Sequence, residues 1–301
     1  MPAVSVVIPT YNHGETVERA IDSALAQTIR DIEVIVVDDA STDDTQAVLD
    51  RIGDPRLTCL RHETNRGGSA ARNTGIDHAT GEYIALLDAD DEWVPTKLEG
   101  QREALESRDQ EWVGVYCDFR QTRSNPLVEW VDNVVRRPTG LEGDDELIDG
   151  ILLRRFAHGG SSTLFLDREA VEAIGGFDPS FQRHQDLEFL LRLLQHGKLA
   201  FVDEVLVYKH DSGYADAETA RAAREKFNDA FADLIAARGF ERRIERIQQF
   251  NMSKYHFREG EFRAAVDALR QSECPHYRDG LGLALAVVSG VRTAIVGVWR
   301  A

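Results

Sequence analysis

The 301-residue sequence has only three cysteines, and their number and spacing bear on whether it contains disulfides or a zinc site. Cys59, Cys117 and Cys274 are an odd number without a Cys-x-x-Cys spacing, which argues against a disulfide framework or a cysteine zinc site. We therefore expect a cytoplasmic protein. No basic segment precedes the first apolar run, so the N-terminus predicts a first strand rather than a secretory signal.

Positive charge is also scarce. The chain carries 52 acidic and 35 basic residues, a net charge of −17 at pH 7, which would repel a nucleic-acid backbone. Nucleic acid is therefore not an expected partner. The lysines are Lys97, Lys198, Lys209, Lys226 and Lys254. This acidic, lysine-poor composition resembles that of proteins from salt-loving archaea, although an acidic GC-rich bacterium would give the same bias.

Several phosphate-binding loops are missing as well. A dinucleotide oxidoreductase needs Gly-x-Gly-x-x-Gly after the first strand, and a P-loop enzyme needs Gly-x-x-x-x-Gly-Lys-Ser/Thr; the sequence contains neither. A sugar-nucleotide pyrophosphorylase needs a glycine- and lysine-rich loop near the N-terminus. Residues 9–12, Pro-Thr-Tyr-Asn, are not such a loop, so this class is a weaker alternative.

Short apolar runs alternate with helical patterns in the first 90 residues. Strands are expected at 4–8, 32–37, 57–60 and 83–87, and helices at 15–26, from a capping-box-like start at Ser41 and Asp44, and at 68–79. This alternation predicts an α/β fold with a mostly parallel central sheet and flanking helices. Further strands are expected near 113–119, 162–166 and 200–208, and a helix at 186–196.

The C-terminal part, residues 213–301, predicts helices only. The apolar stretch 281–299 is interrupted by Gly290, Arg292 and Gly297, so it falls short of a spanning helix. A helix lying in a membrane interface, with Trp299 at the headgroup level, and a terminal helix packed on the protein are equally compatible with it.

Three carboxylates crowd the end of the fourth expected strand, in Asp88-Ala-Asp90-Asp91. Carboxylates this close repel one another unless a cation or a ligand rich in donors lies between them. A divalent ion held there would neutralise a nucleotide diphosphate and stabilise it as a leaving group. Alone, the motif is more typical of a solvated acidic turn that caps the helix after Trp93.

Four other motifs in the chain favour the metal and nucleotide site over the acidic turn. They are Val-Ser-Val-Val-Ile-Pro-Thr-Tyr-Asn (4–12), Val-Val-Asp-Asp-Ala-Ser-Thr-Asp-Asp-Thr (36–45), Asn-Arg-Gly-Gly-Ser-Ala-Ala-Arg-Asn-Thr-Gly (65–75) and Gly-Gly-Phe-Asp-Pro (175–179) followed by Gln-Asp-Leu-Glu-Phe-Leu-Leu-Arg-Leu (185–193). With Gly-Glu-Tyr-Ile-Ala-Leu-Leu-Asp-Ala-Asp-Asp (81–91), the sequence resembles a family 2 glycosyltransferase of the GT-A fold. The resemblance implies a catalytic domain at 1–212, with a nucleotide-binding half at 1–100 and an acceptor-side half at 101–212.

The same resemblance implies a role for several residues. Thr10, Tyr11 and Asp39 would bind the nucleobase, with the tyrosine ring stacked on it and the carboxylate accepting from uracil N–H. Arg66 would lie near the base or a phosphate, and Asp88 would reach the ribose hydroxyls. Asp90 would hold Mn²⁺ or Mg²⁺, with His210 completing the metal shell. Lys209 could meet a phosphate, and His158 is given no role.

Asp186 matches the catalytic base of the family, which would remove the proton of the acceptor hydroxyl and give inversion. The family often has Glu-Asp where this chain has Gln185-Asp186. The expected enzyme transfers a hexose from a UDP-sugar to a glycan or a polyprenyl- or dolichol-linked glycan, at the cytoplasmic face of the membrane. The non-enzymatic alternative is an interaction protein with a degenerate transferase domain, against which the intact carboxylates argue.

Overall fold

The computed structural model describes residues 2–123, 125–135, 140–210, 217–275, 279–284 and 286–288. These residues form two compact units. Unit 1 contains residues 2–122, 140–148 and 158–210, and unit 2 contains 123, 125–135, 149–157 and the described residues from 217 onward. The chain thus leaves and re-enters unit 1 before its last strand. The domain limits 1–212 and 213–301 stay a prediction from the sequence.

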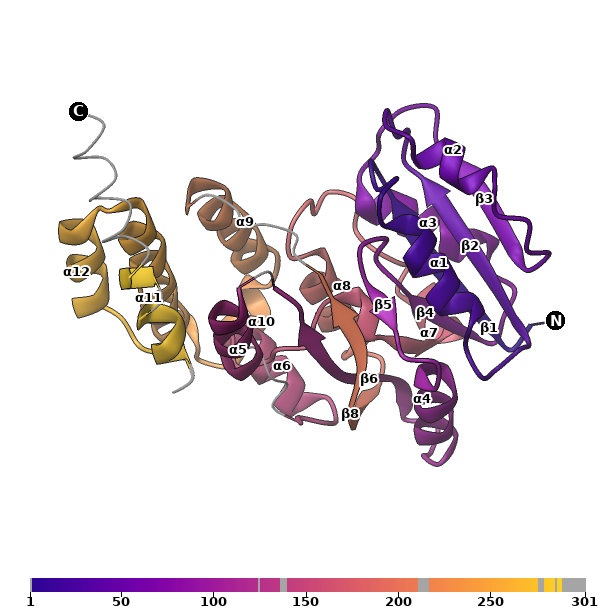
Figure 1. Ribbon diagram of the computed structural model, residues 1–301. Coiled ribbons are helices and arrows are strands. Elements are labelled where there is room, and N and C mark those ends of the chain that lie inside the picture. Colours follow the sequence, from indigo (N-terminus) through magenta and orange to yellow (C-terminus); the bar gives the residue numbers. More distant parts are fainter. Residues whose placement is uncertain are drawn as a thin grey trace. The chain divides into compact units, whose positions relative to one another are not determined.

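Unit 1 is built on one sheet of eight strands (Figure 1). The strands are β1 (Val4–Thr10), β2 (Ile32–Asp38), β3 (Leu57–Arg61), β4 (Tyr83–Leu86), β5 (Glu92–Trp93), β6 (Trp112–Gln121), β7 (Phe165–Asp167) and β8 (Lys198–Lys209). Their order across the sheet is β3-β2-β1-β4-β7-β6-β8-β5. All neighbours from β3 to β4 are parallel, and so are β6 and β8, whereas β7 and β5 run antiparallel to their neighbours. The expected mostly parallel sheet is confirmed.

Helices connect these strands and make up most of unit 2. Between the strands lie α1 (Val17–Leu25), α2 (Thr45–Leu49), α3 (Gly68–His78), α4 (Lys97–Glu106), α5 (Pro126–Val135), α6 (Asp145–Leu152), the short 3-10 helix η1 (Ser161–Thr163), α7 (Arg168–Ala173) and α8 (Gln185–Leu193). The C-terminal part contains α9 (Ala217–Ala230), α10 (Ala232–Ala237), α11 (Glu241–Glu259) and α12 (Phe262–Arg270). The helical C-terminal region is therefore confirmed for the residues that the structure describes.

Alternating side chains of the central strands bury both faces of the sheet. On β2, Val34 and Val36 join the core that contains α1, whereas Ile35 and Val37 pack with Ala71 of α3 on the other face. This is the two-residue period of a strand covered on both sides. Each such side chain contributes roughly 1.5–3 kcal/mol of burial free energy. The parallel strands are thereby fixed, and with them the loops that follow their carboxyl ends.

Two expectations from the sequence differ from the structure in detail. The capping-box start is wrong, because α2 begins at Thr45 and its N-cap Asp44 makes no side-chain capping bond. The Ser41 hydroxyl instead accepts a hydrogen bond from the Asn12 amide at 2.9 Å, which ties the loops after β1 and β2 together. The strand expected at 162–166 begins only at Phe165, after η1.

In the part of the chain that the structure describes, no helix is long and apolar enough to cross a membrane. Most of the stretch 281–299, with its expected membrane contact, lies outside the described residues, which end at 288.

Gly75 allows α3 to lie directly on β1. A Cβ atom at this position would be 2.3 Å from Cγ1 of Val7, closer than any real contact. We expect Gly75→Ala to lower the free energy of unfolding by about 1–3 kcal/mol, because the helix must move off the strand. Gly100→Ala in α4 is the matched control, since a Cβ there meets nothing within 4 Å, and it should be neutral or slightly stabilising. Urea titration measures both; equal stabilities would contradict the close packing.

Candidate active site

The polar loops of unit 1 converge because three neighbouring parallel strands end at the same edge. The strands β2, β1 and β4 are adjacent, and their carboxyl ends lead into Asp39, Tyr11 and Asp88. Ligands of open α/β sheets bind at this edge. The structure therefore brings together the carboxyl-end residues that the sequence assigned to one site.

Asp39 holds the loop before α3. Its buried carboxylate accepts hydrogen bonds from the backbone amides of Arg66 at 2.8 Å and Gly67 at 2.7 Å, and it contacts Nδ1 of His62 at 2.6 Å. The other ring nitrogen of His62 lies 2.9 Å from the Thr74 hydroxyl. Three donors leave about one lone pair of the carboxylate for a ligand. Asp39 therefore positions the start of α3, whatever else it binds.

The other nucleobase candidates are Thr10, the last residue of β1, Tyr11, which follows it, and Arg66, which belongs to this loop. The Tyr11 ring is 43% exposed, which leaves a face open for stacking. The Thr10 hydroxyl is buried and has no hydrogen-bond partner in the described structure. Arg66 is exposed, and no hydrogen bond or ion pair within the described residues holds its side chain. A flat ring, an unused hydroxyl and an available cation are the groups that a nucleotide would need here.

Asp88 is held by two cations. Its carboxylate accepts from Arg72 Nη2 at 2.6 Å and from the Ser161 hydroxyl at 2.9 Å, and Lys209 Nζ lies 3.7 Å away. Burial raises the pKa of this carboxyl, but the charges of Arg72 and Lys209 outweigh burial and hold the pKa at about 2. Asp88 is therefore ionised at neutral pH. Nε and Nη1 of Arg72 are buried without partners among the described residues, so this guanidinium has donors to spare.

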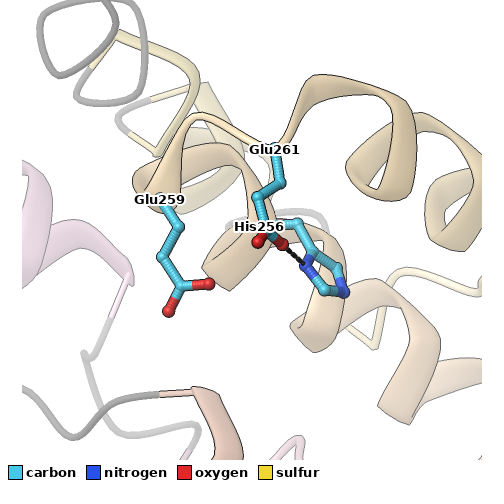
Figure 2. Close-up of side chains that lie close together, drawn as sticks. All are labelled: His256, Glu259 and Glu261. Atoms are coloured by element: carbon cyan, nitrogen blue, oxygen red, sulfur yellow. Dashed lines mark hydrogen bonds and ion pairs between the residues drawn. The ribbon is translucent and has the colours of Figure 1, made fainter. Parts of the chain in front are cut away.

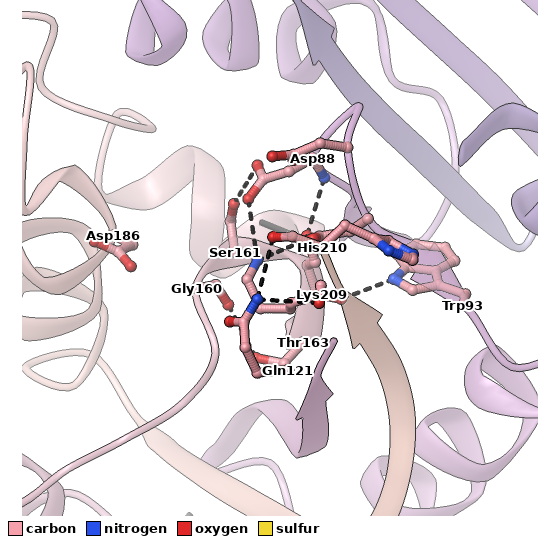
Figure 3. Close-up of polar contacts among 12 residues, drawn as sticks. Asp88, Trp93, Gln121, Gly160, Ser161, Thr163, Asp186, Lys209 and His210 are labelled. Atoms are coloured by element: carbon pink, nitrogen blue, oxygen red, sulfur yellow. Dashed lines mark hydrogen bonds and ion pairs between the residues drawn. The ribbon is translucent and has the colours of Figure 1, made fainter. Parts of the chain in front are cut away.

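Lys209 neutralises the second buried carboxylate. Its ammonium pairs with Oδ2 of Asp91, which also accepts from the Ser162 hydroxyl at 2.5 Å. Burial and the charges of Asp88 and Asp90 raise the pKa of Asp91 to about 6, against the opposing effect of Lys209. Figure 3 shows Lys209 beside the turn that carries Asp88. The protein thus supplies its own cation within the carboxylate cluster.

Asp90 and His210 offer the atoms that a divalent cation would need. No hydrogen bond or ion pair in the described structure holds the Asp90 carboxylate. His210 Nδ1 lies 2.9 Å from the Thr122 hydroxyl, whereas its Nε2 is buried without a hydrogen-bond partner, 3.7 Å from Glu92. Burial, and then Arg19, lower the pKa of His210, so the ring is neutral and able to ligate at neutral pH. The carboxylate is the ligand type that Mn²⁺ and Mg²⁺ prefer, and the unused imidazole nitrogen is a second available ligand atom.

Asp186 lies in the first turn of α8 and is paired with a buried histidine. Its Oδ2 is 3.0 Å from Nε2 of His158, and its Oδ1 accepts from the amide of Leu187 at 3.0 Å. Burial raises the pKa of Asp186, but the hydrogen bond and charge of His158, followed by the charges of His184 and Arg72, hold it below its usual range. Asp186 is therefore ionised and oriented.

Gly160 marks the space between these groups (Figure 3). A Cβ atom at this position would lie 3.6 Å from Lys209 Nζ and 3.9 Å from Oδ2 of both Asp186 and Asp88. Gly160 also has φ +80°, a conformation that L side chains rarely adopt. One small space is therefore bounded by two carboxylates and an ammonium.

Sequence reasoning missed the contacts made by the segment 158–163. His158 was given no role, yet its side chain is 6% exposed and reaches Asp186. Ser161 and Ser162 bind Asp88 and Asp91, 73 and 71 residues away along the chain. The signal was the run Gly-Gly-Ser-Ser at 159–162, which combines backbone freedom with hydroxyl donors but does not name their partners.

Arg192 and Gln185, two residues of α8, make hydrogen bonds to other parts of unit 1. Arg192 pairs with Glu188, and not with Asp186, and it also donates to two backbone carbonyls. Gln185 accepts from the Ser69 hydroxyl at 2.7 Å, which ties α8 to α3. Both residues therefore fix the helix that carries Asp186.

A second group of metal-ligand types occurs in unit 2, at the turn between α11 and α12 (Figure 2). It consists of His256, Glu259 and Glu261, whose ligand atoms lie within 4.8 Å of one another. His256 pairs with Glu261 at 2.7 Å across Gly260, whose φ of +81° ends α11. Both glutamates are exposed. The ion pair of His256 and Glu261 is explained by its structural role, because it holds the turn that joins α11 to α12.

Solved structures of other proteins share the fold of this chain. S. aureus TarS 1-349 in complex with UDP-GlcNAc matches with a TM-score of 0.60 at 16% identity, covering 99% of this chain and 92% of that one. The mannosyltransferase PcManGT from Pyrobaculum calidifontis in complex with GDP-Man and Mn²⁺ also gives a TM-score of 0.60, at 21% identity, covering 99% of this chain and 88% of that one. These likenesses confirm the GT-A fold.

Sequence relatives extend over much of the chain. The UDP-Glc:alpha-D-GlcNAc-diphosphoundecaprenol beta-1,3-glucosyltransferase WfaP of Escherichia coli is 35% identical over 58% of this chain and 64% of its own length. An uncharacterised glycosyltransferase of Rickettsia prowazekii is 31% identical over 78% of this chain and 72% of its own. The chain thus spans less than two thirds of WfaP. The family model described as glycosyl transferase family 2 matches residues 5–175, and the chain belongs to that family.

Proposed function

We propose that the protein catalyses inverting transfer of one sugar from a UDP-sugar to a glycan or a polyprenyl- or dolichol-linked glycan. The observation that carries this proposal is the space beside Gly160, where Oδ2 of Asp186 faces Oδ2 of Asp88 and Lys209 Nζ. A base on one side and groups for a nucleotide diphosphate on the other are what a single displacement needs. The proposed place of action is the cytoplasmic face of a membrane.

The names of similar proteins favour this donor and acceptor. WfaP is named for a UDP-glucose donor and a diphosphoundecaprenol-linked acceptor, and TarS has been crystallised with UDP-GlcNAc. PcManGT has instead been crystallised with GDP-Man, so a guanine nucleotide is the donor alternative to be tested. In our proposal Tyr11 stacks on the base, Thr10 and Asp39 contact its edge, and Arg66 lies over the base or a phosphate.

The remaining residues act on the reacting groups. Asp186 takes the proton of the acceptor hydroxyl while the oxygen of that hydroxyl bonds to the anomeric carbon. At the same time the bond from the anomeric carbon to the diphosphate breaks, and its electron pair leaves with UDP. Asp88 holds the ribose hydroxyls, while Lys209 and Arg72 balance the charge of the departing diphosphate. Asp90 and His210 would hold Mn²⁺ or Mg²⁺, which supplies further positive charge to the diphosphate oxygens.

A nucleotide panel tests the donor. UDP should raise the melting temperature more than GDP, CDP or ADP, and Mn²⁺ should increase the rise. Asp90→Ala should remove the Mn²⁺-dependent part, whereas Asp22→Ala, an exposed aspartate on α1, should keep it. Stabilisation by GDP alone would overturn the uridine assignment, and the absence of any nucleotide effect would favour a degenerate transferase.

Replacing the base separates chemistry from binding. We expect Asp186→Asn to lower kcat by about 10²–10⁴-fold, the range that a general base contributes, while the dissociation constant for UDP changes little. Single-turnover transfer assays and calorimetric UDP titration measure the two quantities. Normal turnover of the variant would show that another group accepts the proton.

The pH profile tests the pairing of Asp186 with His158. In the folded protein the pKa of Asp186 is depressed, so the base stays ionised as the pH falls and activity is lost only below its usual range. His158→Leu removes the largest of the effects that lower this pKa and should move the acid limb of kcat/KM upward by about one pH unit or more. His158→Gln keeps an N–H donor and should move it less. An unchanged limb in His158→Leu would argue that the contact is not maintained during catalysis.

A further inference from the structure

Unit 2 of this acidic chain gathers basic side chains in one place. They are Arg154, which follows α6, Arg224 on α9, and Lys254 on α11. Asp279 is the carboxylate that faces them, at 3.3 Å from Lys254 Nζ. On α11, Tyr255 also interacts electrostatically with Arg154, and Arg258 with Lys254. Arg154, Arg224 and Lys254 carry three positive charges against the one negative charge of Asp279, so positive charge is in excess among these four side chains.

Arg224 is the buried member of this basic cluster. It is 3% exposed, its Nη2 donates to the carbonyl of Leu152 at 2.8 Å, and its Cζ lies 4.8 Å from the ring centre of Phe227. Nη1 is buried and has no hydrogen-bond partner in the described structure. A buried guanidinium N–H without an acceptor costs free energy, and a bound anion would supply the acceptor that it lacks.

Arg154 is the exposed member of the basic cluster. Its backbone has φ +54°, and no hydrogen bond or ion pair in the described structure holds its guanidinium. Burial of Arg224 and then the charge of Arg154 lower the pKa of Arg224 to about 9. The positive charges of the two guanidinium groups therefore repel each other.

The arginine of α8 shows what a purely structural role looks like in this chain. Arg192 pairs with both oxygens of Glu188 and donates to the carbonyls of Ile174 and Gly176. Its charge is matched by Glu188, and each of its three nitrogens donates at least one hydrogen bond. Arg224 is more deeply buried than Arg192, yet it has one acceptor and a cation as its charged neighbour. Packing alone does not account for that difference.

We propose that Arg154, Arg224 and Lys254 form a binding site for a phosphate or diphosphate group. A guanidinium fork binds such an oxyanion through two parallel N–H donors, and an ammonium adds a point charge. A dianion would balance the excess charge that remains after Asp279 is counted. The segment after Arg154 continues directly to His158 and Gly160, so the same stretch of chain serves this site and the catalytic one.

Thermal shift with inorganic phosphate and pyrophosphate tests the site. The titrations are made in EDTA at constant ionic strength, so that divalent-ion binding and screening do not contribute. Both anions should stabilise the natural protein, and Arg154→Gln should weaken the apparent affinity at least tenfold. Arg154 suits this purpose because its side chain has no described partner to lose.

The matched control is Arg221→Gln, which removes the same charge from an exposed position on α9 and should bind as the natural protein does. Equal affinity in Arg154→Gln and Arg221→Gln would overturn the proposal, as would the absence of stabilisation beyond a NaCl control. Arg224→Gln is a second variant. If it is folded, it too should lose the anion effect.

Steady-state transfer separates the two sources of the anion. If the ligand is a diphosphate carried by the acceptor, Arg154→Gln should raise KM for a diphosphate-linked acceptor but not for the donor or for the same sugar without diphosphate. If the ligand is free phosphate, these KM values stay unchanged while anion binding is still lost. Since binding is measured without nucleotide, failure of the proposed glycosyl transfer would leave the phosphate result interpretable.

Discussion

The site of this protein depends on the repulsion between carboxylates at one edge of a parallel sheet. Asp88 and Asp91 are placed there by β4, the strand that precedes them. Arg72 and Lys209 make this crowding tolerable, since Arg72 places a cation beside the partly buried Asp88 and Lys209 places one beside the buried Asp91. The cluster thus contains its own balancing cations before any ligand enters, and the carboxylate of Asp90 has no hydrogen bond or ion pair among the described residues.

The balancing cations come from parts of the chain with other duties. Lys209 is the last residue of β8, and the pairing of β8 with β6 fixes its position along the sheet. Arg72 belongs to α3, the helix whose first turn is held by Asp39. The hydroxyls of Ser161 and Ser162 add donors from a third segment. The arrangement of charges is therefore a property of the sheet and its connections, and one substitution in it would disturb several contacts.

The part of the fold that sequence could predict is the part in which local pattern and burial agree. Buried β-branched runs such as Val34–Val37 identify a strand without tertiary information, and parallel order then places Asp39 and Asp88 at one edge. A strand of two residues, β5, has no period to recognise. The partner of Lys209 lies 118 residues away and that of His158 lies 28 away, so their contacts follow only from the completed fold. Roles for Thr10, Tyr11, Asp39, Arg66, Asp88, Asp90, Asp186 and His210 remain predictions.

The bonds of Asp39 to the loop before α3 have a mechanical consequence. Gly67 is the N-cap of that helix, and Arg72, little more than one turn later, ends on Asp88. Because one helix makes both contacts, a displacement of its Gly67 end would also shift Arg72. In our proposal, the contacts to the base and to the diphosphate are thus linked through this one helix.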